Sequence, residues 1–144
     1  MTVQPFNSQV IGQAHYAARA LLQRELAGTG IGFEQNLALN ATAAGGGTID
    51  RAALVARLTG SLKIDSGAAE TALAGLADAG LLAPAGQAGL ALTREGAALQ
   101  ARTAEAAAAI AGRLYAGIPP EEAAVAGRLL ALIAERANAE LADA

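Results

Sequence analysis

The 144-residue chain contains no cysteine, no tryptophan and a single histidine, His15. Without cysteine it can form no disulfide, no thiolate zinc site and no iron–sulfur cluster, and it has no thiol nucleophile. One histidine cannot build a histidine-based metal cluster, so we expect neither a metal nor another cofactor. No Ser-His-Asp pattern is visible either, and these missing groups argue against an enzyme.

Long apolar runs and a basic leader are missing as well. No uncharged stretch reaches the roughly 18 apolar residues that a membrane-spanning helix needs, so no segment is expected to cross a membrane. Residues 1–10 lack the basic segment and the apolar run of a signal peptide. We therefore expect a cytoplasmic protein with no membrane partner.

Aromatic residues make up only 3% of the chain, whereas apolar residues make up 53%, and many of these are alanine. Because alanine is the strongest helix former, we expect closely packed helices with a core of Leu, Ile, Val and Ala. The net charge of −3 is a poor overall signature for binding nucleic acid, since phosphate neutralisation needs clustered Lys and Arg.

Apolar residues recur at helical spacing near the N-terminus. The first predicted helix covers residues 8–26, and Ser8 is expected to cap it. The second covers residues 33–43, with Phe33, Leu37 and Ala41 on its apolar face.

Two shorter helices follow the glycine triplet at residues 45–47, which we interpret as a flexible linker because it lacks the Lys-Ser/Thr ending of a phosphate loop. Thr48 is expected to cap the first of these helices, and Asp65 or Ser66 the second, which ends at Gly80. Two short helices joined by a tight turn are typical of a helix-turn-helix.

The C-terminal half begins with a predicted β-hairpin, whose strands cover residues 81–83 and 90–92. Thr93 is expected to cap a long helix that runs to about residue 116. A last helix is predicted for residues 119–141, because prolines and then two carboxylates suit a helix start.

This order of elements resembles the MarR family of bacterial transcription regulators, and so do particular residues. The stretch from Leu54 to Gly80, which closes on Leu76-Ala77-Asp78-Ala79-Gly80-Leu81, is similar to the family's helix-turn-helix core. The segment Leu92-Thr93-Arg94-Glu95-Gly96-Ala97-Ala98-Leu99 is similar to the family's long-helix start.

The resemblance implies a mostly α fold, a winged helix-turn-helix with an N- and C-terminal helical dimerisation arm. It covers nearly the whole chain and implies one MarR-like domain over residues 1–144. The winged helix-turn-helix lobe would comprise residues 33–93, and the dimerisation helices residues 8–28 and 94–143.

The resemblance also implies a function, that of a dimeric, ligand-responsive transcriptional repressor that binds a palindromic operator in double-stranded DNA. A homodimer is favoured independently, because the last two helices carry more apolar surface than one small domain can cover. We expect dimer contacts at Ile11, Val125, Leu129, Leu132 and Ile133.

The expected DNA-binding surface departs from the family pattern. The family's wing carries arginines, whereas residues 84–89 are uncharged here, and no Lys or Arg lies between Ser66 and Thr93. Glu70 could accept from a cytosine amino group, but phosphates would repel it. The expected DNA-binding residues are Arg51, Arg57, Lys63, Ser66, Gly67, Ala68, Glu70, Thr71, Gln87 and Arg94. The alternative is a MarR-like dimer that binds a small molecule or a protein partner, with weak or no DNA binding.

Polar residues on the first two predicted helices form the candidate ligand site. In the MarR family, effectors often bind a crevice between the dimer arm and the DNA-binding lobe, and the resemblance places His15, Tyr16, Arg19, Asn36 and Asn40 there. These groups could hold a small aromatic or carboxylate effector. The alternative is that His15 and Tyr16 are partly exposed and that Asn40 satisfies local backbone.

Overall fold

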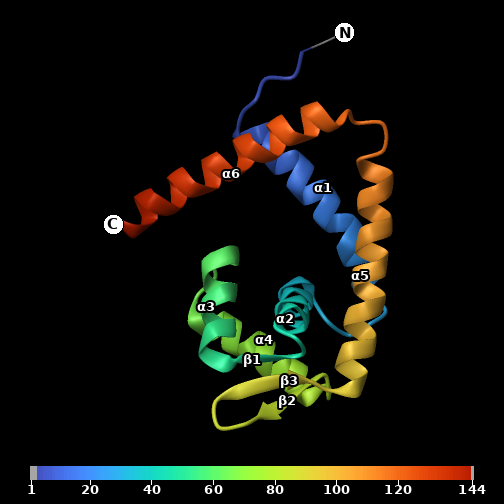
Figure 1. The fold of residues 1–144 in the computed structure, drawn as a ribbon, viewed down its shortest axis with the longest axis vertical. Coiled ribbons are helices and arrows are strands. Elements are labelled where there is room, and N and C mark those ends of the chain that lie inside the picture. Colours follow the sequence, from blue (N-terminus) through green and yellow to red (C-terminus); the bar gives the residue numbers. More distant parts are fainter. Residues whose placement is uncertain (1–2, 144) are drawn as a thin grey trace. The chain divides into compact units, whose positions relative to one another are not determined.

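The computed structural model describes residues 3–143, which form six helices and three strands (Figure 1). The mostly helical fold class is confirmed, as is the predicted order of the helices and the hairpin. The elements are α1 (Ser8–Leu26), α2 (Phe33–Ala44), β1 (Thr48–Asp50), α3 (Arg51–Leu62), α4 (Ser66–Asp78), β2 (Leu82–Ala85), β3 (Gly89–Leu92), α5 (Arg94–Leu114) and α6 (Pro120–Ala142). Within this part of the chain, no helix is long and apolar enough to cross a bilayer.

The sheet contains one strand that the sequence does not predict. Its order is β1-β3-β2, and both pairs are antiparallel. Strand β1 pairs Thr48 with Ala91 and Asp50 with Gly89. Because β1 has only three residues, its sequence is too short to show the alternation that marks a strand.

Two predicted helix caps are wrong. Helix α1 is capped by Asn7, whose Oδ1 accepts the Val10 N–H at 2.9 Å, and not by Ser8. Thr48 cannot cap α3 because it lies in β1, and the cap is Asp50. Both helices use an Asx residue directly before the first helical residue, where a short carboxylate or amide reaches the free N–H groups.

The caps of α4 and α5 agree with the prediction. Asp65 Oδ1 accepts the Ala68 N–H at 2.7 Å, which settles the choice between Asp65 and Ser66. Thr93 Oγ1 accepts the Gly96 N–H at 3.0 Å and donates to the Gly80 carbonyl at 2.6 Å. The start of α5 is therefore tied to the end of the helix-turn-helix.

The core lies among α2, α3, α4 and the sheet, which gather in the lower part of Figure 1. Its largest fully buried side chains include Leu39, Leu54, Leu73 and Leu76. On the predicted apolar face of α2, Ala41 is buried and Leu37 packs against the core, whereas Phe33 is only half-buried. Leu39, which was not placed on that face, is fully buried. Helix α2 contacts α1, α3, α4 and two strands, so it has no single inner face.

The described residues form two compact units, which divide after Ile110. The second unit contains α6, which buries none of its residues. Val125 is 47% exposed and Ile133 is 40% exposed, although both are large and apolar. The helix begins as predicted, with Pro120 in its first turn followed by two acidic residues.

Candidate nucleic-acid interface

Helices α3 and α4 form the helix-turn-helix, and α4 is its second helix. Leu73 and Leu76 anchor α4 in the core. On its outer side Gly67 and Thr71 are exposed, as are Ser66 and Ala68 in the first turn. Because a recognition helix uses its N-terminal residues to contact bases in the major groove, these four residues are the candidates on α4 for such contacts.

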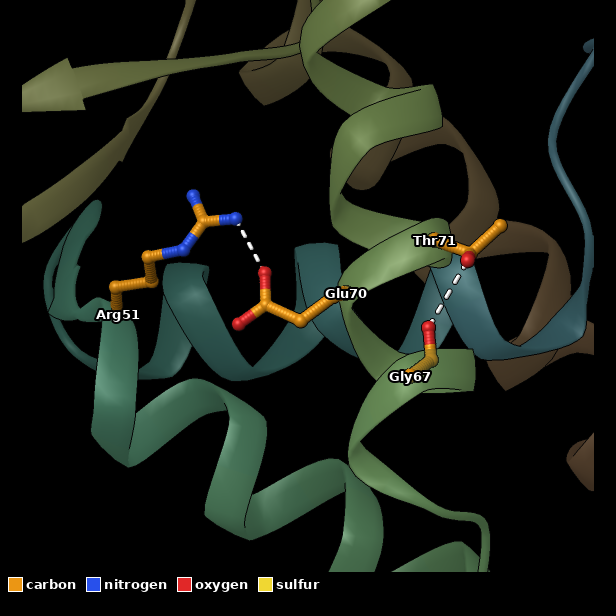
Figure 2. Close-up of polar contacts among 4 residues, drawn as sticks. All are labelled: Arg51, Gly67, Glu70 and Thr71. Carbon is orange, nitrogen blue, oxygen red and sulfur yellow. Dashed lines mark hydrogen bonds and ion pairs between the residues drawn. The ribbon is translucent and has the colours of Figure 1, made fainter.

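Glu70 does not stand alone on this surface. Its Oε2 accepts a hydrogen bond from Arg51 Nη2, and the two side chains form an ion pair between α4 and the start of α3 (Figure 2). Both side chains remain 46% exposed. The acidic residue that was expected to repel phosphates therefore also neutralises one of the basic residues that was expected to bind them.

The second polar contact in Figure 2 lies within α4. Thr71 Oγ1 donates to the Gly67 carbonyl at 2.9 Å, one turn earlier. The Thr71 hydroxyl proton is therefore engaged in a hydrogen bond, but the hydroxyl oxygen can still accept from a base or a bridging water.

The Arg51 backbone is also hydrogen-bonded to the wing. Its N–H donates to the Ala88 carbonyl at 2.9 Å, in the turn between β2 and β3. A shallow groove of about 490 Å³ lies between the α3 start, α4 and this turn, lined by Asp50, Arg51, Ala52, Val55, Ala56, Glu70 and Ala88. Arg51 thus joins all three parts of the candidate interface, a role that the sequence does not reveal.

The other predicted basic residues lie in different surroundings. Lys63 has a left-handed backbone, with φ of 58°, and its Nζ donates to the Gly60 carbonyl at 2.6 Å. Arg57 is exposed but lines a cavity between α2 and α3. Arg94 is exposed at the start of α5, and Gln87 is exposed in the wing turn. Of the four basic residues, Arg51 and Lys63 thus form hydrogen bonds within the protein, whereas Arg57 lines a cavity and Arg94 is exposed.

The predicted ligand residues on α1 lie on its surface. Tyr16 is 68% exposed, and its ring packs edge-on against His15 with 5.3 Å between the centroids. Arg19 Cζ lies 4.1 Å from the centroid of the Phe33 ring, a cation–π contact that joins α1 to α2. His15 and Tyr16 therefore have the exposure that the alternative interpretation describes.

The predicted ligand residues on α2 are better enclosed. Asn36 is 2% exposed, and within residues 3–143 its Oδ1 is a buried side-chain atom that has no hydrogen-bond partner. Asn40 Oδ1 accepts from Gln100 Nε2 of α5 at 3.1 Å, so it does not serve local backbone. The described residues contain no cluster of three or more His, Asp or Glu that could hold a metal ion.

Comparison with known proteins gives matches to solved structures alone. No family model and no curated protein sequence matches the chain. The transcriptional regulator PA3341 superposes with a TM-score of 0.74 at 25% identity, over 92% of this chain and 96% of that one. The reduced form of MarR from E. coli gives 0.68 at 20% identity, over 92% and 95%. The MarR family protein Rv2887 from Mycobacterium tuberculosis, in complex with salicylic acid, gives 0.64 at 21% identity, over 90% and 98%.

The chain has the fold of the MarR-family winged-helix regulators. The resemblance predicted from the sequence is confirmed. The structure also explains why the two motifs contain these residues. Leu81 follows α4, and its carbonyl oxygen would lie 2.0 Å from a Cβ at Gly96. Only glycine permits so close an approach between the two motifs.

Proposed function

We propose that the chain is a dimeric, ligand-responsive transcription regulator that represses by binding a palindromic operator. The observation that carries the proposal is the exposed N-terminal half of α4, held beside a β-hairpin wing in a MarR-type fold. A regulator of this kind acts on the chromosome, so the proposal places it in the cytoplasm, and enzymatic activity is no part of it.

In the proposed complex, α4 enters the major groove. Its exposed residues Ser66, Gly67, Ala68 and Thr71 approach base edges, with Glu70 beside them. Gln87, in the wing turn, contacts the DNA backbone. The phosphate contacts come from Arg51, Arg57, Lys63 and Arg94.

The dimer and the ligand site rest on separate observations. The exposed apolar residues of α6 support a dimer interface, to which Ile11 of α1 would add. The buried, unpartnered Asn36 Oδ1 and the Asn40–Gln100 pair support a ligand crevice that also uses His15, Tyr16 and Arg19. Salicylic acid in the Rv2887 complex supports a small aromatic carboxylate as the effector class.

A second candidate function is favoured by the charges at the interface. Residues 66–93 contain no Lys or Arg, and Glu70 neutralises Arg51. A MarR-type dimer with these features could bind an effector or a protein partner and bind DNA weakly or not at all.

Footprinting on the DNA upstream of the protein's own gene distinguishes the two functions. The proposed regulator protects two half-sites that are related by inverted symmetry and separated by one helical turn, about 10 bp, or a multiple of it. An effector should weaken the protection. Uniform protection of every duplex, or none at low salt, would contradict operator binding and leave the second candidate function.

A further inference from the structure

A groove of about 370 Å³ lies between α2 and α3, mostly along their C-terminal halves. We call it the α2–α3 groove, and its lining residues are Leu37, Asn40, Ala41, Ala44, Arg57, Leu58, Ser61 and Leu62. Its volume lies within the range of small-molecule sites, about 300–1,000 Å³. The groove lies wholly within the first compact unit.

The walls of the groove combine an apolar surface with a few polar groups. Three leucines and two alanines supply the apolar part, and Arg57 is the one charged residue of the eight lining residues. This composition suits a ligand with an apolar body and a polar end. It does not suit a cation, because no carboxylate lines the groove.

The polar groups of the groove can all donate hydrogen bonds. The Arg57 guanidinium has no ion pair within residues 3–143, where the ion pair found is that of Arg51 with Glu70. The Asn40 amide oxygen accepts from Gln100, and the N–H₂ group of the same amide can donate. The Ser61 hydroxyl can donate as well.

We propose that the α2–α3 groove binds a small carboxylate with an apolar body. The carboxylate pairs with the planar guanidinium of Arg57, which can bind it through two parallel hydrogen bonds, and Asn40 and Ser61 supply further donors. The apolar body lies against Leu37, Leu58 and Leu62.

A ligand in this groove would join two parts of the molecule. Leu58 and Ser61 belong to the first helix of the helix-turn-helix, whereas Asn40 belongs to α2 and is hydrogen-bonded to α5. Occupancy would therefore bias the position of α3 against α2 and α5. The proposal goes beyond the proposed function, because the groove contains none of His15, Tyr16, Arg19 and Asn36, and it requires no binding of DNA.

The test uses the full chain without DNA. Benzoate is titrated against ¹⁵N-labelled protein, and benzyl alcohol serves as the uncharged analogue. We expect benzoate to shift the Asn40, Arg57 and Ser61 resonances in a saturable manner, and benzyl alcohol to bind at least about tenfold more weakly, because it cannot form a charge-assisted pair.

Two variants locate the charge that is responsible. Arg57→Gln should weaken benzoate binding about tenfold or more, and Arg57→Lys should lie between it and the parent, because lysine keeps the charge but loses the paired geometry. Arg24→Gln on the exposed side of α1 removes the same charge elsewhere and should leave binding unchanged.

A filled groove provides a second, independent variant. Ala44 is exposed at the end of α2, so Ala44→Leu should fold normally and obstruct the groove. The proposal would be overturned if benzoate shifted resonances centred on His15 and Asn36, or if Arg57→Gln and Ala44→Leu bound benzoate as the parent does. It would also be overturned if the resonances shifted only with protein concentration. The last result would mean that a second copy of the chain fills the groove.

Discussion

At the residue scale, the charge of Glu70 has two effects that a DNA-binding assay can separate. Glu70 lies on α4 beside the exposed residues Gly67 and Thr71, and its carboxylate forms an ion pair with Arg51. Two half-exposed partners contribute little stability, about 0–1 kcal/mol, so the pair matters more for binding than for folding.

Replacing Glu70→Gln should strengthen binding to all duplexes. The substitution removes a repulsion and releases Arg51 for a phosphate, so the salt dependence should steepen by about one phosphate per subunit. Fluorescence anisotropy with an operator and a scrambled duplex, over a range of salt concentrations, measures both quantities.

Two controls belong to this prediction. Asp78→Asn removes the same charge at the far end of α4 and should have a smaller effect. In the double variant Arg51→Gln with Glu70→Gln, the gain in salt dependence should disappear. If Glu70 instead accepts from a cytosine, Glu70→Gln will weaken the operator alone, by about 1–3 kcal/mol, and the repulsion account is wrong.

Gly96 gives a stability prediction at the same scale. A Cβ there would lie 2.0 Å from the Leu81 carbonyl oxygen, so Gly96→Ala must displace backbone. We expect it to lower the free energy of unfolding by about 1–3 kcal/mol or more. Gly60→Ala in α3, where no atom lies within 4 Å of the added Cβ, should instead raise it by up to about 1 kcal/mol.

Chemical denaturation of both variants at one fixed protomer concentration makes this comparison, because the stability of a dimer depends on concentration. Equal effects of the two substitutions would mean that Gly96 is not a packing requirement. The motif itself is visible in the sequence, but its physical cause is not, since the Leu81 carbonyl approaches it only in the folded chain.

At the element scale, the sequence predicts the long helices well and short or paired features poorly. The last helix was expected at residues 119–141 and is found at Pro120–Ala142, because its apolar period and its proline start are both local signals. Strand β1 escapes prediction because pairing with β3 creates it. The Arg51–Glu70 pair is hidden for the same reason, since its partners are 19 residues apart and meet only through the packing of α3 against α4.

The apolar stripe of α6 carries the prediction about assembly. Changing Leu129 and Ile133 to Asp should convert a dimer into a monomer or an aggregate, because it places unpaired charges in an apolar interface. Ala131→Asp, on the opposite side of the helix, is the matched control and should leave the dimer intact. Analytical ultracentrifugation checks all three proteins.

A well-folded parent chain that sediments as a monomer at every concentration would contradict the expected interface. So would a variant with both aspartates that remains dimeric. Circular dichroism of each protein shows whether a change in mass reflects dissociation or unfolding.

At the scale of the whole molecule, the fold favours DNA binding, whereas the charge distribution disfavours it. The fold is that of MarR-type regulators, yet the net charge is −3 and the recognition helix and wing contain no basic residue. Both facts can be predicted from the sequence. The sequence does not show that Arg51 is paired or that Arg57 lines the α2–α3 groove, because both depend on how α3 packs.

The most direct test of the proposed regulator is the salt dependence of its affinity for its operator. The proposed complex has four basic residues per subunit for phosphate contacts, and Glu70 already neutralises one of them, Arg51. A dimer can therefore make at most about eight such contacts, which limits the slope of log K against log salt to about −7. We predict specific binding of a dimer to duplex DNA with a slope shallower than this limit. A slope that corresponds to ten or more phosphates, or no binding to any duplex at low salt, would contradict the account.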